Sequence, residues 1–147
     1  MYRNLRCIIF LSIFLSMFIS IGSAVESTAM ASAGQVTEIS ARELAALMTA
    51  SQDLVIIDVD TPGQYKEGHI KGSLFGDGRL LRTQPEEYLD SLGVDKSKKI
   101  ILVCETGHKS RRIAETLLKT NYHNVYNLEG GKLGWARSGF NLISGGK

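Results

Sequence analysis

The chain has 147 residues, with 17 Lys and Arg side chains against 15 Asp and Glu, and a formal charge of +2. This length fits one domain of ordinary size. A composition that is 44% hydrophobic, with only two prolines, excludes a disordered or collagen-like chain. The small charge comes without a dense Lys/Arg stripe, so no nucleic-acid partner is expected. Two cysteines exclude a disulfide scaffold and a four-cysteine zinc site.

The N-terminus has the pattern of a secretory signal peptide. Arg3 and Arg6 precede an apolar stretch at residues 7–21, which is shorter than the roughly 20 apolar residues of a spanning helix. Small residues follow, so we expect cleavage after Ala24, with Ala33 as a second candidate. An uncleaved membrane anchor is the alternative.

Cleavage at the first of these sites would remove residues 1–24 as the signal peptide, and with them Cys7 and both units of net charge. Residues 25–35 are small and polar and are expected to form a flexible lead-in to one domain at 36–147. The expected compartment is the periplasm or the medium, with no membrane association after cleavage. Cys104 would then be the lone cysteine, either a buried inert thiol or a reactive one.

The rest of the chain alternates short apolar runs with helical patterns. In chain order we expect a helix at about 41–50, a strand at 54–57, a short helix opening at Pro62, a strand near 73–75, a helix capped by Thr83, a strand at 100–103, a helix from Ser110, a strand from Val125 and a last helix after Gly131. Strands separated by helices predict an α/β fold, with a mainly parallel central sheet and helices on both faces. Such sheets bind ligands beyond the carboxyl ends of their strands, where Cys104 falls.

The segment from Cys104 to Ser110 is predicted to run from the strand through a tight loop into a helix. Such a loop points successive N–H groups inward as an anion nest, and Gly107 can adopt the backbone angles it needs. These donors favour a thiolate, which suits attack on sulfur or phosphorus. The candidate substrate-binding residues are Glu105, Thr106, Gly107, His108, Lys109 and Ser110. The structural alternative is a buried cysteine followed by an ordinary turn.

Three segments in order resemble the rhodanese-like (sulfurtransferase) family. Residues 54–73 resemble its D-V-R-x-x-x-E-Y … G-H-I-x-G-A block, residues 104–110 (CETGHKS) resemble its C-x-x-G-x-R-S loop, and residues 122–135 resemble its G-Y-x-x-V-Y-N-L-x-G-G-x-x-x-W ending. Together the resemblance runs from Val36 to Ile143, nearly the whole expected domain. It implies a three-layer rhodanese-like fold.

The resemblance also implies a chemistry. Cys104 would take a sulfane sulfur from a small donor of the thiosulfate or polysulfide type and hold it as a persulfide. A thiophilic acceptor, namely cyanide, a small thiol or a protein thiol, would then remove that sulfur. The resemblance implies no metal and no organic cofactor.

The chain departs from the family pattern at three charged positions. Asp60 stands in place of an arginine, Glu105 stands where arginine is frequent, and Lys109 replaces the arginine of the loop. Lysine lacks the bidentate fork of arginine, and both acids would oppose a thiolate and repel a dianionic donor. We therefore expect weak activity towards thiosulfate, or a preference for a less charged donor.

Asp58 and His69 are candidate supporting residues. Asp58 could orient the loop or serve as a structural turn acid, and His69 fits the block in which the family's histidine is mainly architectural. His108 could contact substrate or face solvent. The three histidines lack the spacing of metal ligands, so no metal site is expected.

Two other functions compete with sulfur transfer. One is a non-catalytic rhodanese-like sulfur carrier or partner-binding module, which the altered charges favour. The other is a cysteine phosphatase or arsenate reductase, whose loop needs an arginine that grips the oxyanion. Ser110 occupies that position and Arg111 comes one residue late, which disfavours this second class.

Overall fold

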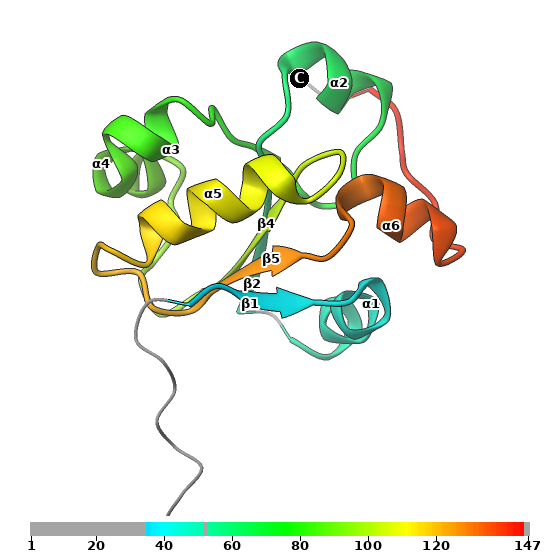
Figure 1. Cartoon of the computed structure of the whole chain (residues 1–147), viewed down its shortest axis with the longest axis horizontal. Helices are drawn as coiled ribbons and strands as arrows, with labels where there is room; N and C mark the ends of the chain where they lie inside the picture. The colour runs from blue at the N-terminus through cyan, green and yellow to red at the C-terminus, as the bar shows by residue number, and fades with distance from the viewer. Residues whose placement is uncertain (1–34, 52, 146–147) are drawn as a thin grey trace, which may run out of the picture. The chain divides into compact units, whose positions relative to one another are not determined.

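The structure is a computed structural model that describes residues 35–51 and 53–145 (Figure 1). The predicted signal peptide, both of its candidate cleavage sites and all but the last residue of the lead-in lie outside the described residues. Within the described ranges no helix is long and apolar enough to cross a membrane.

Five strands of the described chain form one sheet, and every neighbouring pair in it is parallel. In spatial order they are β1 (Thr37–Ile39), β5 (Val125–Leu128), β4 (Lys99–Val103), β2 (Leu54–Asp58) and β3 (Leu74–Phe75). After Lys99 the central strand β4 is a continuous apolar run, because both faces of the sheet are covered. The predicted α/β class with a mainly parallel sheet is confirmed.

Helices cover both faces of the sheet (Figure 1). The six helices of the described residues are α1 (Ala41–Ala50), α2 (Pro62–Glu67), α3 (Leu80–Thr83), α4 (Pro85–Ser91), α5 (His108–Leu117) and α6 (Gly131–Arg137). On one face, Leu44 of α1 and Trp135 of α6 share a core cluster with sheet residues. On the other, Leu81, Leu89 and Ile113 bring α3, α4 and α5 into a second cluster. The three layers follow from these two cores.

Two helices begin with capping boxes, which fix where each helix leaves its strand. Ser40 Oγ accepts the N–H of Glu43 at 3.3 Å, and Glu43 Oε2 accepts the N–H of Ser40 at 2.9 Å. Thr61 and Gln64 make the same reciprocal pair at 3.3 and 3.2 Å, with proline at the first helical position. The predicted helix at 41–50 and the helix opening at Pro62 are confirmed.

The predicted helix cap at Thr83 is wrong. Residue 83 is the last residue of α3, and its hydroxyl donates to the carbonyl of Arg79 at 3.0 Å. The chain is already helical there, so the hydroxyl is satisfied within its own helix. The next helix, α4, begins at Pro85, whose fixed φ suits a first helical position.

The predicted start of α5 at Ser110 is also wrong, because the helix begins two residues earlier at His108. Gly107 has φ +86° and ψ −11°, a left-handed conformation that turns the chain directly into the helix. Residues other than glycine rarely adopt this backbone conformation. The loop after Cys104 is therefore tighter than predicted.

The register of the two central strands positions the candidate site. Asp58, the last residue of β2, pairs with Val103, the last residue of β4, and the N–H of Val59 donates to the carbonyl of Val103 at 2.8 Å. The segments that follow β2 and β4 therefore leave the sheet at the same edge. This brings residues 58–60 beside Cys104 although more than forty positions separate them.

Candidate active site

Cys104 follows β4 directly, and its side chain is only 2% exposed. The loop curls back so that Sγ accepts the N–H of Gly107 at 3.2 Å and the N–H of Ser110 at 3.4 Å. The Ser110 hydroxyl lies 3.3 Å from the same sulfur. Backbone N–H groups aimed at one atom stabilise negative charge on it, at no cost of reorganisation during the reaction.

Ser110 and Asn127 join the loop to β5. The Ser110 hydroxyl has three acceptors within reach but a single proton, and the nearest is Asn127 Oδ1 at 2.6 Å. Asn127 Nδ2 donates to the carbonyl of Gly107 at 3.1 Å and to Glu38 Oε2 at 2.8 Å. The side-chain amide therefore holds both Ser110 and the left-handed turn in place, which leaves the two backbone N–H groups dedicated to the sulfur.

The first turn of α6 supports the loop from behind. The N–H of Lys132 donates to the carbonyl of Cys104 at 2.9 Å, and the N–H of Leu133 donates to the carbonyl of Glu105 at 3.0 Å. Gly131 lies so close to the loop that a Cβ there would overlap the carbonyl oxygen of Cys104. The two loops at the ends of β4 and β5 are thus one packed unit.

Asp58, Asp60 and Lys132 form a buried charge cluster beside this unit. Lys132 Nζ lies 3.2 Å from Asp58 Oδ2 and 2.9 Å from Asp60 Oδ2, and it donates to the carbonyl of Gly68 at 2.9 Å. Asp58 Oδ1 accepts the N–H of Asp60 at 3.0 Å. All three side chains are almost completely shielded from solvent.

Burial and the neighbouring charges shift the pKa values of this cluster in opposite directions. Burial raises the pKa of Asp58 above its ordinary value, because it outweighs the N–H of Asp60 and the nearby ammonium. Burial alone would lower the pKa of Lys132, but the hydrogen bond to Asp60 and the charges of both carboxylates together raise it. Lys132 is therefore a cation that compensates two acids.

The expectation that Asp60 opposes a thiolate and repels the donor needs correction. Its carboxylate is buried and bound to Lys132, so its charge is partly balanced inside the domain and is not presented to solvent. Glu105 is different, because it is exposed and its Oε2 accepts the Gln64 side-chain N–H of α2 at 3.1 Å. Of the two acids, only Glu105 presents its charge to solvent beside the loop.

The remaining loop side chains lie on different sides of the sulfur. Thr106 and His108 are exposed, with His108 Nδ1 3.0 Å from Thr106 Oγ1, and both line a cavity of about 540 Å³ between α5, α6 and β5. Cys104 does not line that cavity. Lys109 is half-buried on the opposite side, with its Cε 3.4 Å from where a Cβ on Gly78 would lie. The structure therefore brings Gly107 and Ser110 to the sulfur, but not Thr106 or His108.

His69 is part of the scaffold around α2. Its ring stacks on Tyr65 with centroids 4.0 Å apart, and its Nδ1 lies 2.9 Å from the Tyr65 carbonyl oxygen. The backbone of His69 also pairs with Ile143. The described part of the chain holds no cluster of three or more His, Cys, Asp or Glu that could bind a metal ion.

Three site residues were not predicted from the sequence: Gln64, Asn127 and Lys132. An asparagine within an apolar strand is a detectable signal, because a buried amide needs partners. Lys132 gave no such signal, since a lysine after two glycines at a helix start is typical of a solvated surface. Arg111, the late arginine considered for an oxyanion grip, instead pairs with Glu38 at 3.2 Å, away from the sulfur.

Comparison with known proteins agrees with this geometry. A family model described as "Rhodanese-like domain" matches residues 40–138. A sulfurtransferase of Allochromatium vinosum is 26% identical over 109 residues, covering 74% of this chain and 96% of that protein. A tRNA uridine(34) hydroxylase of Hamiltonella defensa is 30% identical over 91 residues, which cover 62% of this chain. The aligned part of the chain spans only 26% of that hydroxylase's length.

Solved structures show the same fold. A rhodanese-like domain protein from Staphylococcus aureus matches with a TM-score of 0.61 at 25% identity, covering 76% of this chain and all of that one. A thiosulfate sulfurtransferase from Pseudomonas aeruginosa matches with a TM-score of 0.62 at 27% identity, covering 76% of this chain and 21% of its own. The fold, the cysteine loop and the family match together show that this chain belongs to the rhodanese-like domain family.

Proposed function

We propose that this protein is a sulfurtransferase that carries a sulfane sulfur on Cys104. The observation that carries the proposal is the pair of backbone N–H groups held on Sγ at the end of β4. In the first step the Cys104 thiolate attacks the outer sulfur of the donor. The S–S bond of the donor breaks, and its leaving group departs with the electron pair, as sulfite does from thiosulfate. Cys104 is left as a persulfide anion.

The second step returns the enzyme to its starting state. A thiolate or cyanide attacks the outer sulfur of the persulfide, the S–S bond to Cys104 breaks, and Cys104 leaves as a thiolate. The N–H groups of Gly107 and Ser110 bind that thiolate as it forms. No net electron is gained or lost by the protein over the cycle, and no further group is required.

Intact-mass spectrometry tests the proposal directly. After incubation with polysulfide or thiosulfate, the full-length protein should gain the mass of one sulfur atom, and cyanide should remove it. Cys104→Ser should gain none, because the nucleophile is missing. If the unmodified protein never gains sulfur from either donor, the chain is instead a non-catalytic binding module.

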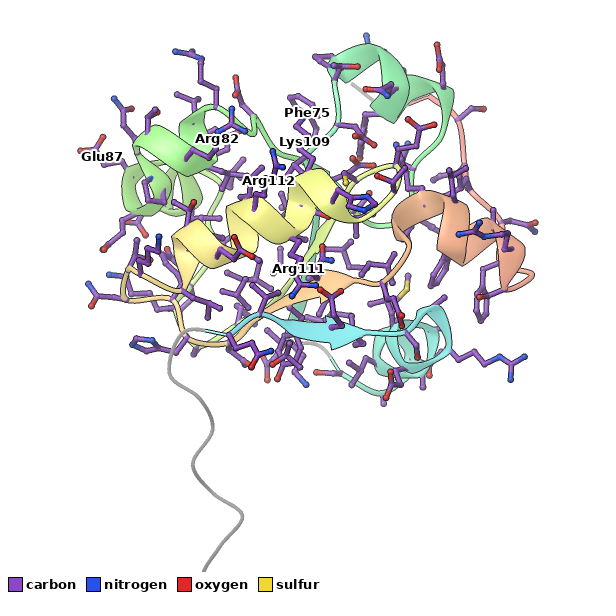
Figure 2. The ribbon with its side chains drawn as sticks, viewed as in Figure 1. Phe75, Arg82, Glu87, Lys109, Arg111 and Arg112 are labelled. Atoms are coloured by element: carbon purple, nitrogen blue, oxygen red, sulfur yellow. The ribbon has the colours of Figure 1, made fainter. Side chains whose placement is uncertain are left out.

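Glu105→Arg should raise kcat/KM for thiosulfate by about tenfold, or about 1.4 kcal/mol. The exposed carboxylate of Glu105 repels a dianion, and the substitution turns repulsion into attraction. The kcat/KM for a neutral persulfide donor should change little, because such a donor carries no charge for residue 105 to repel or attract. Thiocyanate formation measures both rates, and Glu87→Arg, which changes another exposed acid, on α4 (Figure 2), is the matched control. An equal gain in both variants, or none in Glu105→Arg, contradicts the prediction.

We also propose that the protein is exported, on the strength of the charged and apolar pattern of residues 1–21. The same mass spectrum of protein recovered from its host should show an N-terminus after Ala24 or Ala33. A lone reactive thiol in an oxidising compartment needs protection from oxidation. The nearly complete burial of Cys104 provides it.

A further inference from the structure

Arg82, Lys109 and Arg112 leave an unpaired positive surface next to the cysteine loop. Figure 2 shows their side chains projecting from the same edge of the domain, one from α3 and two from α5. Lys109 and Arg112 are three residues apart and so share one face of their helix. Within the described part of the chain, none of the three has an ion-pair or side-chain hydrogen-bond partner.

Several other cations of the described chain are paired with acids. Lys96 binds Glu86 at 2.9 Å, Lys98 binds Asp53 at 2.7 Å, and Arg111 lies between Glu38 and Glu115 at 3.2 and 3.7 Å. Figure 2 shows Arg111 directed towards β1, away from its neighbour Arg112. The two lysine and arginine side chains of α5 without an acidic partner among the described residues, Lys109 and Arg112, are thus separated from the paired Arg111.

Asp77, an acid just before α3, is already satisfied by the backbone. Asp77 Oδ1 accepts the N–H groups of Arg79 and Leu80 at 2.7 and 3.2 Å. These two donors hold the pKa of Asp77 below its ordinary value, with smaller contributions from the charges of Arg79 and Lys109. Arg79 is itself exposed and adds a fourth positive charge at the start of α3. These four cations outnumber Asp77 and the exposed Glu87 of α4, so the local charge balance is positive.

Cys104 faces the same side of the sheet. Its side chain belongs to the core cluster that contains Leu81 of α3 and Ile113 of α5, the residues beneath this surface. Lys109 belongs both to the cysteine loop and to the positive surface. Phe75, the half-buried last residue of β3, lies three residues before Gly78, against which the Lys109 side chain packs, and its ring offers an apolar contact.

We propose that the surface formed by Phe75, Arg82, Lys109 and Arg112 docks an acidic segment of a partner protein, whose cysteine thiolate takes the sulfur from Cys104. The inference rests on the proposed function. The surface carries three cations on two helices, more positive charge than a small dianion such as thiosulfate would neutralise. A protein partner is favoured over nucleic acid because the transfer requires a thiol. The exposed Glu105 on the α2 side would repel the same acidic segment and so fix its orientation.

The transfer step balances without a further reactant. The partner thiolate attacks the outer sulfur of the Cys104 persulfide, and a new S–S bond forms on the partner. The old S–S bond breaks, with its electron pair staying on Cys104. The partner leaves as a persulfide anion, and neither protein is oxidised or reduced overall.

Two cysteine peptides of equal length, one rich in Glu and one rich in Lys, test the proposal on the full-length protein after sulfur loading. The acidic peptide should accept sulfur at least about tenfold faster at low salt, and the advantage should shrink as salt is added. The Arg82→Gln/Arg112→Gln variant should lose most of this rate advantage of the acidic peptide. The matched control is Arg42→Gln/Arg137→Gln, which removes two exposed charges of α1 and α6 that have no ion-pair partner among the described residues. Removal of sulfur by cyanide should be equal in all three proteins.

Binding of a labelled acidic peptide with serine in place of cysteine separates docking from chemistry. If this surface docks an acidic segment, peptide binding should weaken as salt is added. Of the two double variants, only Arg82→Gln/Arg112→Gln should lose binding. Both results are expected whether or not Cys104 ever loads sulfur. Equal rates for the two peptides, or equal losses in the two double variants, would overturn the proposal. It would also be overturned if a short single-stranded DNA of the same charge displaced the peptide as well as an unlabelled acidic peptide does.

Discussion

Gly131→Ala should abolish sulfur loading on Cys104 and lower the free energy of unfolding by about 3–5 kcal/mol. The added methyl group would overlap the carbonyl oxygen of Cys104. It would also lie 2.6 Å from both the carbonyl oxygen of Glu105 and the nitrogen of Gly107. These are backbone atoms, which cannot rotate away as a flexible side chain can. Relief requires the cysteine loop to move off α6, and the N–H groups then leave the sulfur.

Two effects contribute to this loss, and a second glycine separates them. Gly131 has φ +57°, so alanine there is strained in addition to clashing. Gly139 has φ +88° with nothing within 4 Å of an added Cβ, so Gly139→Ala reports strain alone. We expect Gly139→Ala to cost about 1–2 kcal/mol and to keep normal sulfur loading. Thermal unfolding and intact mass measure both variants. Similar behaviour of the two would show that the backbone clash is not what matters.

The sequence predicted those parts of the fold that depend on local chemistry. The capping pair at Ser40 and the proline at residue 62 placed α1 and α2 correctly, and the apolar run of β4 placed Cys104 at a strand end. The errors at Thr83 and Ser110 are local too. In each case the spacing fitted a helix start, but the chain had already entered a helix, through Leu80 or through the left-handed Gly107.

The candidate site was only partly predictable, because its supporting contacts join residues far apart in the chain. The loop from Cys104 to Ser110 is local and carries its own motif. Lys132, however, meets Asp58 and Asp60 only because β2 and β4 end at the same edge of the sheet. From the sequence, Asp60 was an acid that opposes the reaction. In the structure, a lysine 72 positions later compensates it.

Lys132→Met should lower the free energy of unfolding at pH 7 by about 3–5 kcal/mol. Methionine keeps most of the volume and the backbone N–H that binds Cys104, so the change is mainly one of charge. It leaves two carboxylates buried without their cation and removes the donor to the carbonyl of Gly68. Uncompensated buried charge is among the most destabilising changes a core can carry.

The pH dependence of this loss identifies its cause. A carboxyl whose pKa is raised on folding adds stability below its ordinary pKa, and that contribution is lost as pH rises through the raised value. Burial already raises the pKa of Asp58, and without Lys132 it should rise further. The gap in unfolding free energy between Lys132→Met and the unmodified protein should therefore be largest near pH 7 and shrink towards pH 4. A gap that is constant over this range would point to lost packing instead.

A double variant separates charge from packing within the same cluster. Asp60→Asn removes one of the two carboxylates, so Lys132→Met/Asp60→Asn should be more stable at pH 7 than Lys132→Met by about 1–2 kcal/mol. Asp60→Asn alone should destabilise the protein, because it breaks the 2.9 Å ion pair. This reversal of sign is expected only if Asp60 and Lys132 compensate each other. If Asp60→Asn destabilises both backgrounds equally, the two residues are energetically independent, and Asp60 again becomes a candidate for repelling the donor.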